Sequence, residues 1–272
     1  MSICVAFNLS DGVVIAVDSA TTMTDASGTI SKVFLDADKL FQLGGLKIGI
    51  ATYGVAALDG RTIGSFLRQF TSDGANADIA TLDVASIAER LRAFFFDHYK
   101  AFAEKLYGIP FDQIAANLKG SLGLVVGGFS SGAFQSELWE IVIPTNETVG
   151  SSRCVFAQGK IGHAWFASAL PINRYLKGFD WQIIGKIDAF LKAALGRDLT
   201  QAEIQQLVTS FEDCEYHIQT DGMPIQSGID CARFFVEFVL GHYRFAETHP
   251  IVGGKAKIGV VAYGHSAFRI LE

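Results

Sequence analysis

The chain has 272 residues, of which 50% are apolar and 18% are charged, and its formal net charge is −6 at pH 7. This composition is sufficient for a large buried core, whereas the negative charge argues against nucleic acid or an anionic membrane as a partner. The longest apolar runs stop well short of the roughly 20 residues that a membrane span needs, and the N-terminus lacks the basic region of a signal peptide. We therefore expect a cytoplasmic protein that binds neither nucleic acid nor membrane.

The chain begins with Met1 followed by a serine in an apolar run. The small side chain of Ser2 would allow a methionine aminopeptidase to remove Met1, which leaves Ser2 with a free α-amino group. An α-amine has a reference pKa of roughly 7.7–8.0, so near neutral pH part of it can accept the hydroxyl proton during nucleophilic attack. Ser2 is therefore a candidate nucleophile that carries its own base. From its position alone, the plainer interpretation is a small residue at a frayed terminus.

A hairpin is predicted at Ser10-Asp11-Gly12, because Asp and Gly between apolar runs both tolerate positive φ. The strand that starts at Ser2 then folds back on residues 13–18, a run that is apolar until Asp18. This places a carboxylate at the end of the second strand, close to the start of the first. The alternative role for Asp18 is to cap a turn.

A third strand is predicted over residues 39–43, with Lys39 and Phe41 on one face. A lysine on a half-buried face needs a partner of opposite charge, and Asp18 is the candidate. Residues 46–54 form a further predicted strand, which leads into a helix from Val55 to Phe70. Gly54 lies at the turn between them, where a backbone N–H can face an oxyanion.

The order of these segments resembles the β-type subunits of proteasomes and their bacterial relatives. The motifs that carry the resemblance are Asp11-Gly-Val-Val-Ile-Ala-Val-Asp-Ser19, Lys39-Leu-Phe-Gln-Leu43 and the strand that ends in Gly54. The opening Met-Ser-Ile-Cys-Val-Ala is most similar to the Anbu group of bacterial proteasome-like proteins. The resemblance extends to the end of the predicted helix at Phe70 and returns near the C-terminus. Each motif is weak alone, whereas their order and spacing together are fairly specific.

The resemblance implies an N-terminal nucleophile (Ntn) hydrolase that cleaves peptide bonds, and an α+β fold that is a four-layer α-β-β-α sandwich of two stacked antiparallel sheets. It also implies self-assembly into a ring or spiral homo-oligomer and a peptide or unfolded polypeptide as substrate. The implied catalytic residues are the nucleophile Ser2, the charge pair Asp18 and Lys39, and the oxyanion N–H donor Gly54. Thr22 and Ala56 are implied to pair with the substrate backbone. No cofactor and no metal are expected.

Several positions depart from the family pattern. Ser2 stands in place of the usual threonine, and Ala20 in place of an arginine often found there. The family has a Ser-Gly site before its third helix, and Lys160 occupies the position of that serine, so it is a candidate substrate-binding residue. The family's C-terminal acid and serine fall on or near His249 and Val252.

Beyond Phe70, the hydrophobic periodicity predicts further strands and helices. Strands are predicted over 121–129, 134–143, 154–158 and 256–263, and helices over 83–107, 161–176, 181–195, 200–211 and 227–247. Pro171 is expected to kink or end the helix that contains it, and Thr200 with Glu203 to form a capping box.

This order of elements predicts one domain over 1–272, with two sheets between helical layers. A helical insertion is predicted around 177–225, and it would cover a cleft or contact another subunit. Four cysteines lie in apolar segments and are expected to be reduced and buried: Cys4, Cys154, Cys214 and Cys231. Cys214-x-x-His217 has no second pair at zinc spacing, which argues against a structural metal.

Three functions remain open from the sequence. The first is hydrolysis of peptide amides by a processed Ser2 through an acyl-enzyme ester. The second is a non-catalytic proteasome-like subunit that assembles without freeing Ser2. The third is a small-molecule amidase of the same type, trimmed to Cys4, although the two-residue offset of Cys4 against Asp18 disfavours it.

Overall fold

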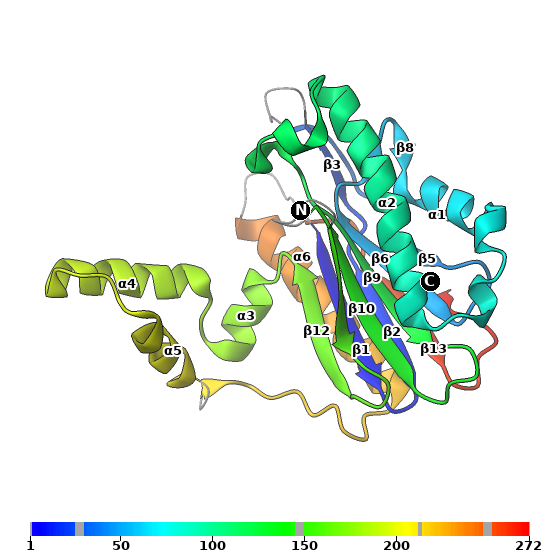
Figure 1. Ribbon diagram of the computed structural model, residues 1–272. Coiled ribbons are helices and arrows are strands. Elements are labelled where there is room, and N and C mark those ends of the chain that lie inside the picture. The colour runs from blue at the N-terminus through cyan, green and yellow to red at the C-terminus, as the bar shows by residue number, and fades with distance from the viewer. Residues whose placement is uncertain (1, 25–29, 145–149, 212–213, 247–251, 272) are drawn as a thin grey trace. The chain divides into compact units, whose positions relative to one another are not determined.

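A computed structural model describes residues 2–24, 30–144, 150–211, 214–246 and 252–271 (Figure 1). They form an α+β protein with two antiparallel five-stranded sheets. The chain divides into two compact units, of which the first comprises Met1–Ala167 and Thr220–Glu272, and the second Ser168–Gln219. The second unit overlaps the region 177–225 in which a helical insertion is predicted.

The first sheet has the strand order β12-β1-β2-β13-β14. Its strands are β1 (Ile3–Leu9), β2 (Gly12–Val17), β12 (Gly162–Ala167), β13 (Lys257–Ala262) and β14 (Arg269–Leu271). The register of β1 on β2 runs from Leu9 opposite Gly12 to Cys4 opposite Val17, which confirms the predicted hairpin. Every residue of β1 and β2 is buried, because both strands lie inside the sheet with neighbours on each side.

The second sheet has the order β11-β10-β9-β6-β5. Its strands are β5 (Leu40–Gln42), β6 (Ile48–Gly54), β9 (Leu122–Phe129), β10 (Ser136–Ile143) and β11 (Ser151–Phe156). All five were predicted, with boundaries that differ by a few residues. Two further hairpins are formed by β3 (Thr21–Thr24) with β4 (Ile30–Phe34) and by β7 (Ala57–Leu58) with β8 (Arg61–Thr62).

Three long helices belong to the first unit: α1 (Ile63–Ser72), α2 (Val84–Tyr107) and α6 (Ile225–Ala246). Helix α2 packs on β9, β10 and β11, and α6 packs on β1, β2 and β13. Short 3₁₀ turns lie at Gly74–Asn76, Ile79–Thr81, Phe111–Gln113 and Ala116–Leu118. Each sheet therefore has a helix-covered face.

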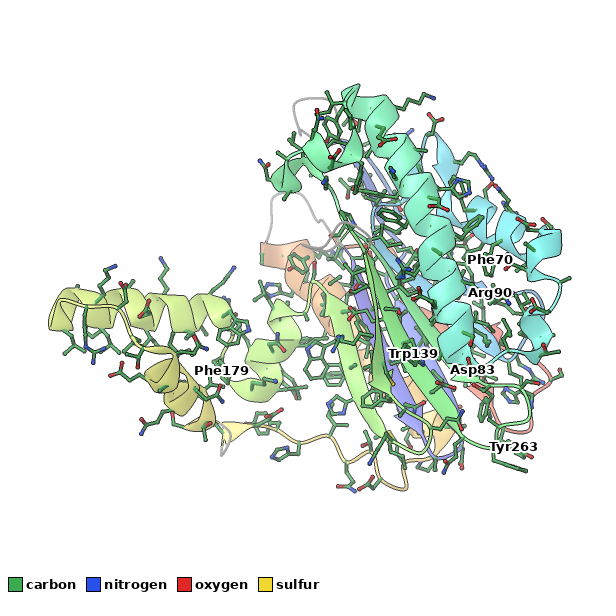
Figure 2. All side chains as sticks on the ribbon, viewed as in Figure 1. Phe70, Asp83, Arg90, Trp139, Phe179 and Tyr263 are labelled. Carbon is green, nitrogen blue, oxygen red and sulfur yellow. The ribbon has the colours of Figure 1, made fainter. Side chains whose placement is uncertain are left out.

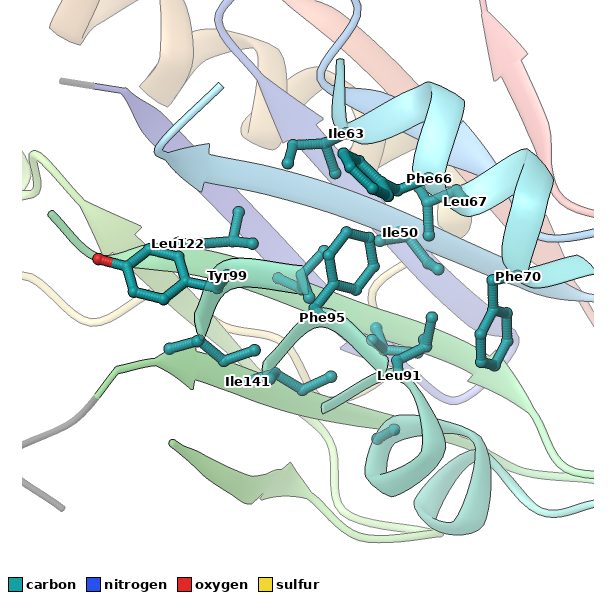
Figure 3. Packing of buried hydrophobic residues seen from close by; sticks show 14 of the residues in the cluster. Ile50, Ile63, Phe66, Leu67, Phe70, Leu91, Phe95, Tyr99, Leu122 and Ile141 are labelled. Atoms are coloured by element: carbon teal, nitrogen blue, oxygen red, sulfur yellow. The ribbon is translucent and has the colours of Figure 1, made fainter. Parts of the chain in front are cut away.

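Two apolar clusters hold these elements together. In the first, shown in Figure 3, Phe66 and Phe70 of α1 and Phe95 of α2 pack over Ile50 of β6. The second cluster draws its side chains from both sheets, and Ile15 of β2 is one of its fully buried members. The face of each sheet that carries no helix is therefore buried against the other sheet.

Helix α2 has the boundaries that its sequence predicts. Asp83 caps it, since its Oδ1 accepts a hydrogen bond from Ser86 N at 2.6 Å, and Figure 2 labels this residue at the start of the helix. Gly108 ends the helix with a left-handed φ of 68°, a conformation that glycine adopts without steric cost.

Two helix predictions are wrong in their first halves. Residues 55–62 contain the β7–β8 hairpin instead of a helix, because Asp59 and Gly60 both take positive φ and turn the chain. Residues 162–167 form β12, since this aromatic, β-prone stretch pairs with β1 over its whole length. Pro171 then lies in the first turn of α3, where its missing N–H costs no hydrogen bond.

The second unit contains α3 (Leu170–Lys177), α4 (Trp181–Leu195) and α5 (Gln201–Thr209). Asp180 caps α4 by accepting hydrogen bonds from the N–H groups of Gln182 and Ile183, at 2.7 and 3.0 Å. The predicted capping box of Thr200 and Glu203 is confirmed. Within this unit Phe179 stacks on Phe211 with ring centroids 4.9 Å apart (Figure 2).

All four cysteines are free thiols, but their burial differs from the prediction. Cys4 is buried and Cys231 is partly buried, whereas Cys154 and Cys214 are exposed, so the prediction of burial is wrong for these two. Cys154 lies on β11, and an apolar neighbourhood in sequence does not fix which side of a strand faces solvent. None of the helices in the described part of the chain is long and apolar enough to cross a membrane.

We expect Phe95→Ala to lower the free energy of unfolding by about 3–5 kcal/mol, since it removes a fully buried ring and leaves a cavity. Phe134→Ala is the matched control, because its ring is 72% exposed. Chemical denaturation of both variants measures the difference, and equal losses would contradict the packing described for α2.

Candidate active site

The start of β1 and the end of β2 lie side by side, because the hairpin brings the two strand ends together. Ser2 is only 3% exposed, and Asp18 is fully buried. Asp18 N donates to Ile3 O at 3.3 Å, and Ile3 N donates to Asp18 Oδ1 at 3.1 Å. The length of the hairpin thus fixes a carboxylate beside the N-terminal serine.

Lys39 reaches both residues from a different segment. Its Nζ lies 2.9 Å from Asp18 Oδ1 and 2.9 Å from Ser2 Oγ, and the residue is 5% exposed. The predicted ion pair of Lys39 with Asp18 is therefore present. The backbone of Lys39 is held by the second sheet, since Thr52 N donates to Lys39 O at 2.8 Å. The three side chains thus form one contiguous polar group at the ends of both sheets.

The carboxylate of Asp18 receives four hydrogen bonds. Oδ1 accepts from Ile3 N and Lys39 Nζ, and Oδ2 accepts from Ala20 N at 3.2 Å and Gly253 N at 3.4 Å. A buried carboxylate is costly without such partners, and here each of its two oxygens accepts two hydrogen bonds. Ala20 lies two positions from Asp18 in sequence and Ile3 lies 15, whereas Gly253 lies 235 positions away.

Burial lowers the pKa of the Lys39 ammonium below its ordinary value, and attraction to Asp18 opposes this shift without cancelling it. In this arrangement the Lys39 ammonium donates to Ser2 Oγ. A cation at this distance stabilises negative charge that develops on the hydroxyl oxygen, so the group can assist the serine as a nucleophile.

Gly54 ends β6 with a φ of +80°, and a Cβ at this position would lie 1.9 Å from Ser121 O. Only glycine fits there. Val55 N donates to Ser121 O, just before β9, so the alternation of the antiparallel ladder turns Gly54 N–H away from β9. This N–H points to the edge of β6 on which Thr52 N donates to Lys39 O. No residue of β5 lies opposite Gly54, because β5 begins at Leu40, which pairs with Ala51. Gly54 N–H therefore lies on the edge of β6 that bonds Lys39, and its role as an oxyanion donor stays a prediction.

Tyr53 fixes the end of β6 just before Gly54. Its hydroxyl donates to Glu140 Oε1 at 2.7 Å, and its ring stacks on Phe166 with centroids 6.4 Å apart. Burial raises the pKa of the Tyr53 hydroxyl, which keeps the proton that this hydrogen bond needs. This contact was not anticipated from sequence, although an aromatic beside a strand-ending glycine is a usable signal.

Thr22 and Ala56 lie on segments that flank the site in sequence. Thr22 is on β3, opposite Val33, and its Oγ1 is buried with no hydrogen-bond partner among the described atoms. Ala56 follows β6, and its carbonyl accepts a hydrogen bond from Ile63 N at 3.4 Å. Their pairing with substrate stays a prediction.

Lys160 is not brought to Ser2. It precedes β12, and its carbonyl accepts a hydrogen bond from Asn8 Nδ2 at 2.7 Å. At about 3.3 Å per residue, the strand from Ser2 to Asn8 spans about 20 Å. The match of Lys160 to a residue before a helix rested on the helix prediction that β12 overturns. Ser168 stands two residues before α3 and directly follows Ala167, which pairs with Ile3.

The two C-terminal candidates from the family pattern are His249 and Val252. His249 lies outside the described residues. Val252 is fully buried, and the next residue, Gly253, supplies the backbone N–H to Asp18. Sequence reasoning missed this contact because a backbone donor leaves no side-chain signal.

No group of three or more His, Cys, Asp or Glu side chains that could hold a metal occurs within the described ranges. No protein-family model matches the chain, and a search of curated proteins found no match. The candidate site therefore rests on its geometry and on the order of motifs in the sequence.

We expect Lys39 to titrate below the ordinary lysine pKa of roughly 10.4. Because the folded pKa lies below the unfolded one, the unfolded state binds more protons between the two values, so the contribution of Lys39 to the free energy of unfolding rises with pH across that window. Titration of ¹³Cε-labelled lysine by NMR measures this pKa, with Lys39→Met to assign the signal. Asp18→Asn should lower the pKa further, since it removes the charge that favours the ammonium. A midpoint at or above the ordinary value would contradict the burial of Lys39.

Proposed function

We propose that this protein is a proteasome-like N-terminal nucleophile hydrolase that cleaves peptide bonds with Ser2 after removal of Met1. The observation that carries the proposal is the position of Lys39 Nζ, 2.9 Å from both Ser2 Oγ and Asp18 Oδ1 in a buried site. The two antiparallel sheets, packed on each other and covered by helices, support the four-layer α-β-β-α sandwich that such a hydrolase would have.

In the proposed reaction, Ser2 Oγ attacks the carbonyl carbon of a peptide bond and gives its proton to the freed α-amine. The proton passes to the leaving nitrogen as the C–N bond breaks, which leaves an ester on Ser2. Water then attacks the ester, a base again takes the proton, and Ser2 Oγ leaves as a hydroxyl. The positive charge of Lys39, when present, disfavours protonation of the nearby α-amine and keeps it available as a base.

Gly54 N–H is the proposed donor to the oxyanion of the tetrahedral intermediate. An extended substrate would lie between the segments of Thr22 and Ala56, and the unpartnered Thr22 Oγ1 supports a polar contact there. The substrate would therefore be a peptide or unfolded polypeptide, whose backbone offers regularly spaced donors and acceptors.

The amidase with Cys4 as nucleophile gains no support. Cys4 is fully buried inside β1, between Val17 and Phe166 in the sheet, and burial raises the pKa of its thiol. A buried thiol with a raised pKa is a poor nucleophile.

Ser2→Ala should abolish hydrolysis of peptide amides and esters while the fold remains, because only a hydroxyl is lost. Lys39→Ala should lower kcat/KM by about 10²–10⁴-fold, the range for an impaired general base, because the α-amine loses the cation that disfavours its protonated form. Retention of Met1, enforced by an uncleaved N-terminal extension that leaves Ser2 intact, should mimic Ser2→Ala. The measurement is turnover of a fluorogenic peptide library, after mass spectrometry verifies Ser2 at the N-terminus.

Ser10→Ala and Lys47→Ala are the matched controls, since Ser10 is exposed and follows β1 at the end away from Ser2, and Lys47 precedes β6 at the end away from Gly54. Both should leave turnover unchanged. If the wild type with a verified N-terminal Ser2 hydrolyses nothing in the library, the catalytic proposal fails and the non-catalytic assembly subunit takes its place.

We also propose that identical copies assemble into a ring or spiral. Large apolar side chains are exposed on the first unit, among them Phe245 at 83% and Leu35 at 55%. Exposed apolar surface of this kind is typical of an interface between copies.

Sedimentation velocity at micromolar concentration should give a mass that is a multiple of the 29.4 kDa chain. The assembly should dissociate on dilution, because its formation depends on concentration. A single species at 29.4 kDa throughout the concentration series would overturn the proposal of self-assembly.

A further inference from the structure

Ser19 follows Asp18 directly and is 1% exposed. Its hydroxyl donates to Leu35 O and accepts a hydrogen bond from Lys255 N at 2.8 Å. Its carbonyl accepts a hydrogen bond from Ala37 N at 2.8 Å. This one residue therefore joins the end of β2 to two segments that are distant from it in sequence.

Both joined segments lead to the polar group at Ser2. Leu35 and Ala37 lie on the stretch that runs from β4 to Lys39, so their bonds to Ser19 fix where the Lys39 backbone enters the site. Lys255 belongs to the loop 252–255, whose Gly253 N donates to Asp18 Oδ2. The hydrogen bonds of Ser19 thus hold both the stretch that leads to Lys39 and the loop that donates to Asp18.

Gly254 lets this loop pack closely against the Ser19 hydroxyl. Its φ is +78°, and a Cβ would lie 2.2 Å from Ser19 Oγ and 2.2 Å from Leu35 O. The loop backbone therefore packs on the hydrogen bond of Ser19 with no space for a side chain, and even one added methyl group must displace it.

We infer that Ser19 is a positioning residue, which holds Asp18 and Lys39 at their mutual spacing through the loop 252–255 and the stretch 35–37. The expected effect on turnover rests on the proposed function, whereas the positioning of Asp18 and Lys39 by Ser19 does not. A misplacement of about 1 Å in a catalytic group can lower a rate by about 10²-fold. Loss of the Ser19 hydroxyl should therefore lower kcat more than it raises KM.

The first test compares Ser19→Ala with Ser136→Ala. Ser136 is a matched control because it is 2% exposed and its hydroxyl also makes a buried hydrogen bond, to Asn8 Oδ1 at 2.8 Å, at the end of β1 away from Ser2. Ser19→Ala should lower kcat by about 10–100-fold with KM within about twofold, whereas Ser136→Ala should leave both within about twofold of wild type.

The second test acts on the loop without altering Ser19. Gly254→Ala should lower kcat in the same way, and Gly45→Ala is its control, since Gly45 has a φ of +79° and nothing within 4 Å of its added Cβ. The two glycine variants carry the same backbone strain, and only one displaces the loop. This pair also tests the inference if Ser19→Ala fails to fold.

A readout without turnover separates the inference from the proposed function. The ¹³Cε titration midpoint of Lys39 should move in Ser19→Ala and Gly254→Ala and stay at the wild-type value in both controls. If the wild type is inert, the proposed function fails while this titration still tests the positioning. The inference is overturned if Lys39 titrates alike in all five proteins, or if the controls change kcat as much as the paired variants.

Discussion

The arrangement of the site depends on the buried ion pair of Lys39 and Asp18. Two charges inside a protein are stable only when geometry and further hydrogen bonds compensate for lost hydration. Here the compensation comes from backbone N–H groups at the carboxylate and from the Ser2 hydroxyl at the ammonium. Removal of either charged partner would leave the other buried and uncompensated, so the pair has to be built by several segments at once.

Both sheets contribute to that pair, and neither could supply it alone. Asp18 ends a strand of the first sheet, whereas Lys39 is tied to Thr52 in the second. The distance between the ammonium and the carboxylate therefore depends on how the two sheets pack, and the apolar cluster between the sheets sets that packing. Stability and polar geometry are linked here, since a loosened interface between sheets would also separate the charges.

The sequence predicted the local parts of this arrangement and the ion pair of Lys39 with Asp18, but it missed the contact that comes from the loop at Gly253. The β1–β2 hairpin and the placement of Asp18 beside Ser2 follow from turn chemistry and an apolar run. Gly253 N–H could not be predicted, because a backbone donor from a distant loop has no sequence signature. The helix predicted through residues 162–167 failed because pairing with β1 outweighed local periodicity, and the position assigned to Lys160 failed with it.

The contact of Gly253 with Asp18 joins residues 235 positions apart. During synthesis the chain emerges from its N-terminus, so Ser2, Asp18 and Lys39 leave the ribosome long before the loop that completes their surroundings. Strand β13, which pairs with β2 inside the first sheet, is made later still. The fold thus delays completion of the polar group until residues 253–262 have been made, so a nascent chain that stops before them would carry Ser2 without its finished environment.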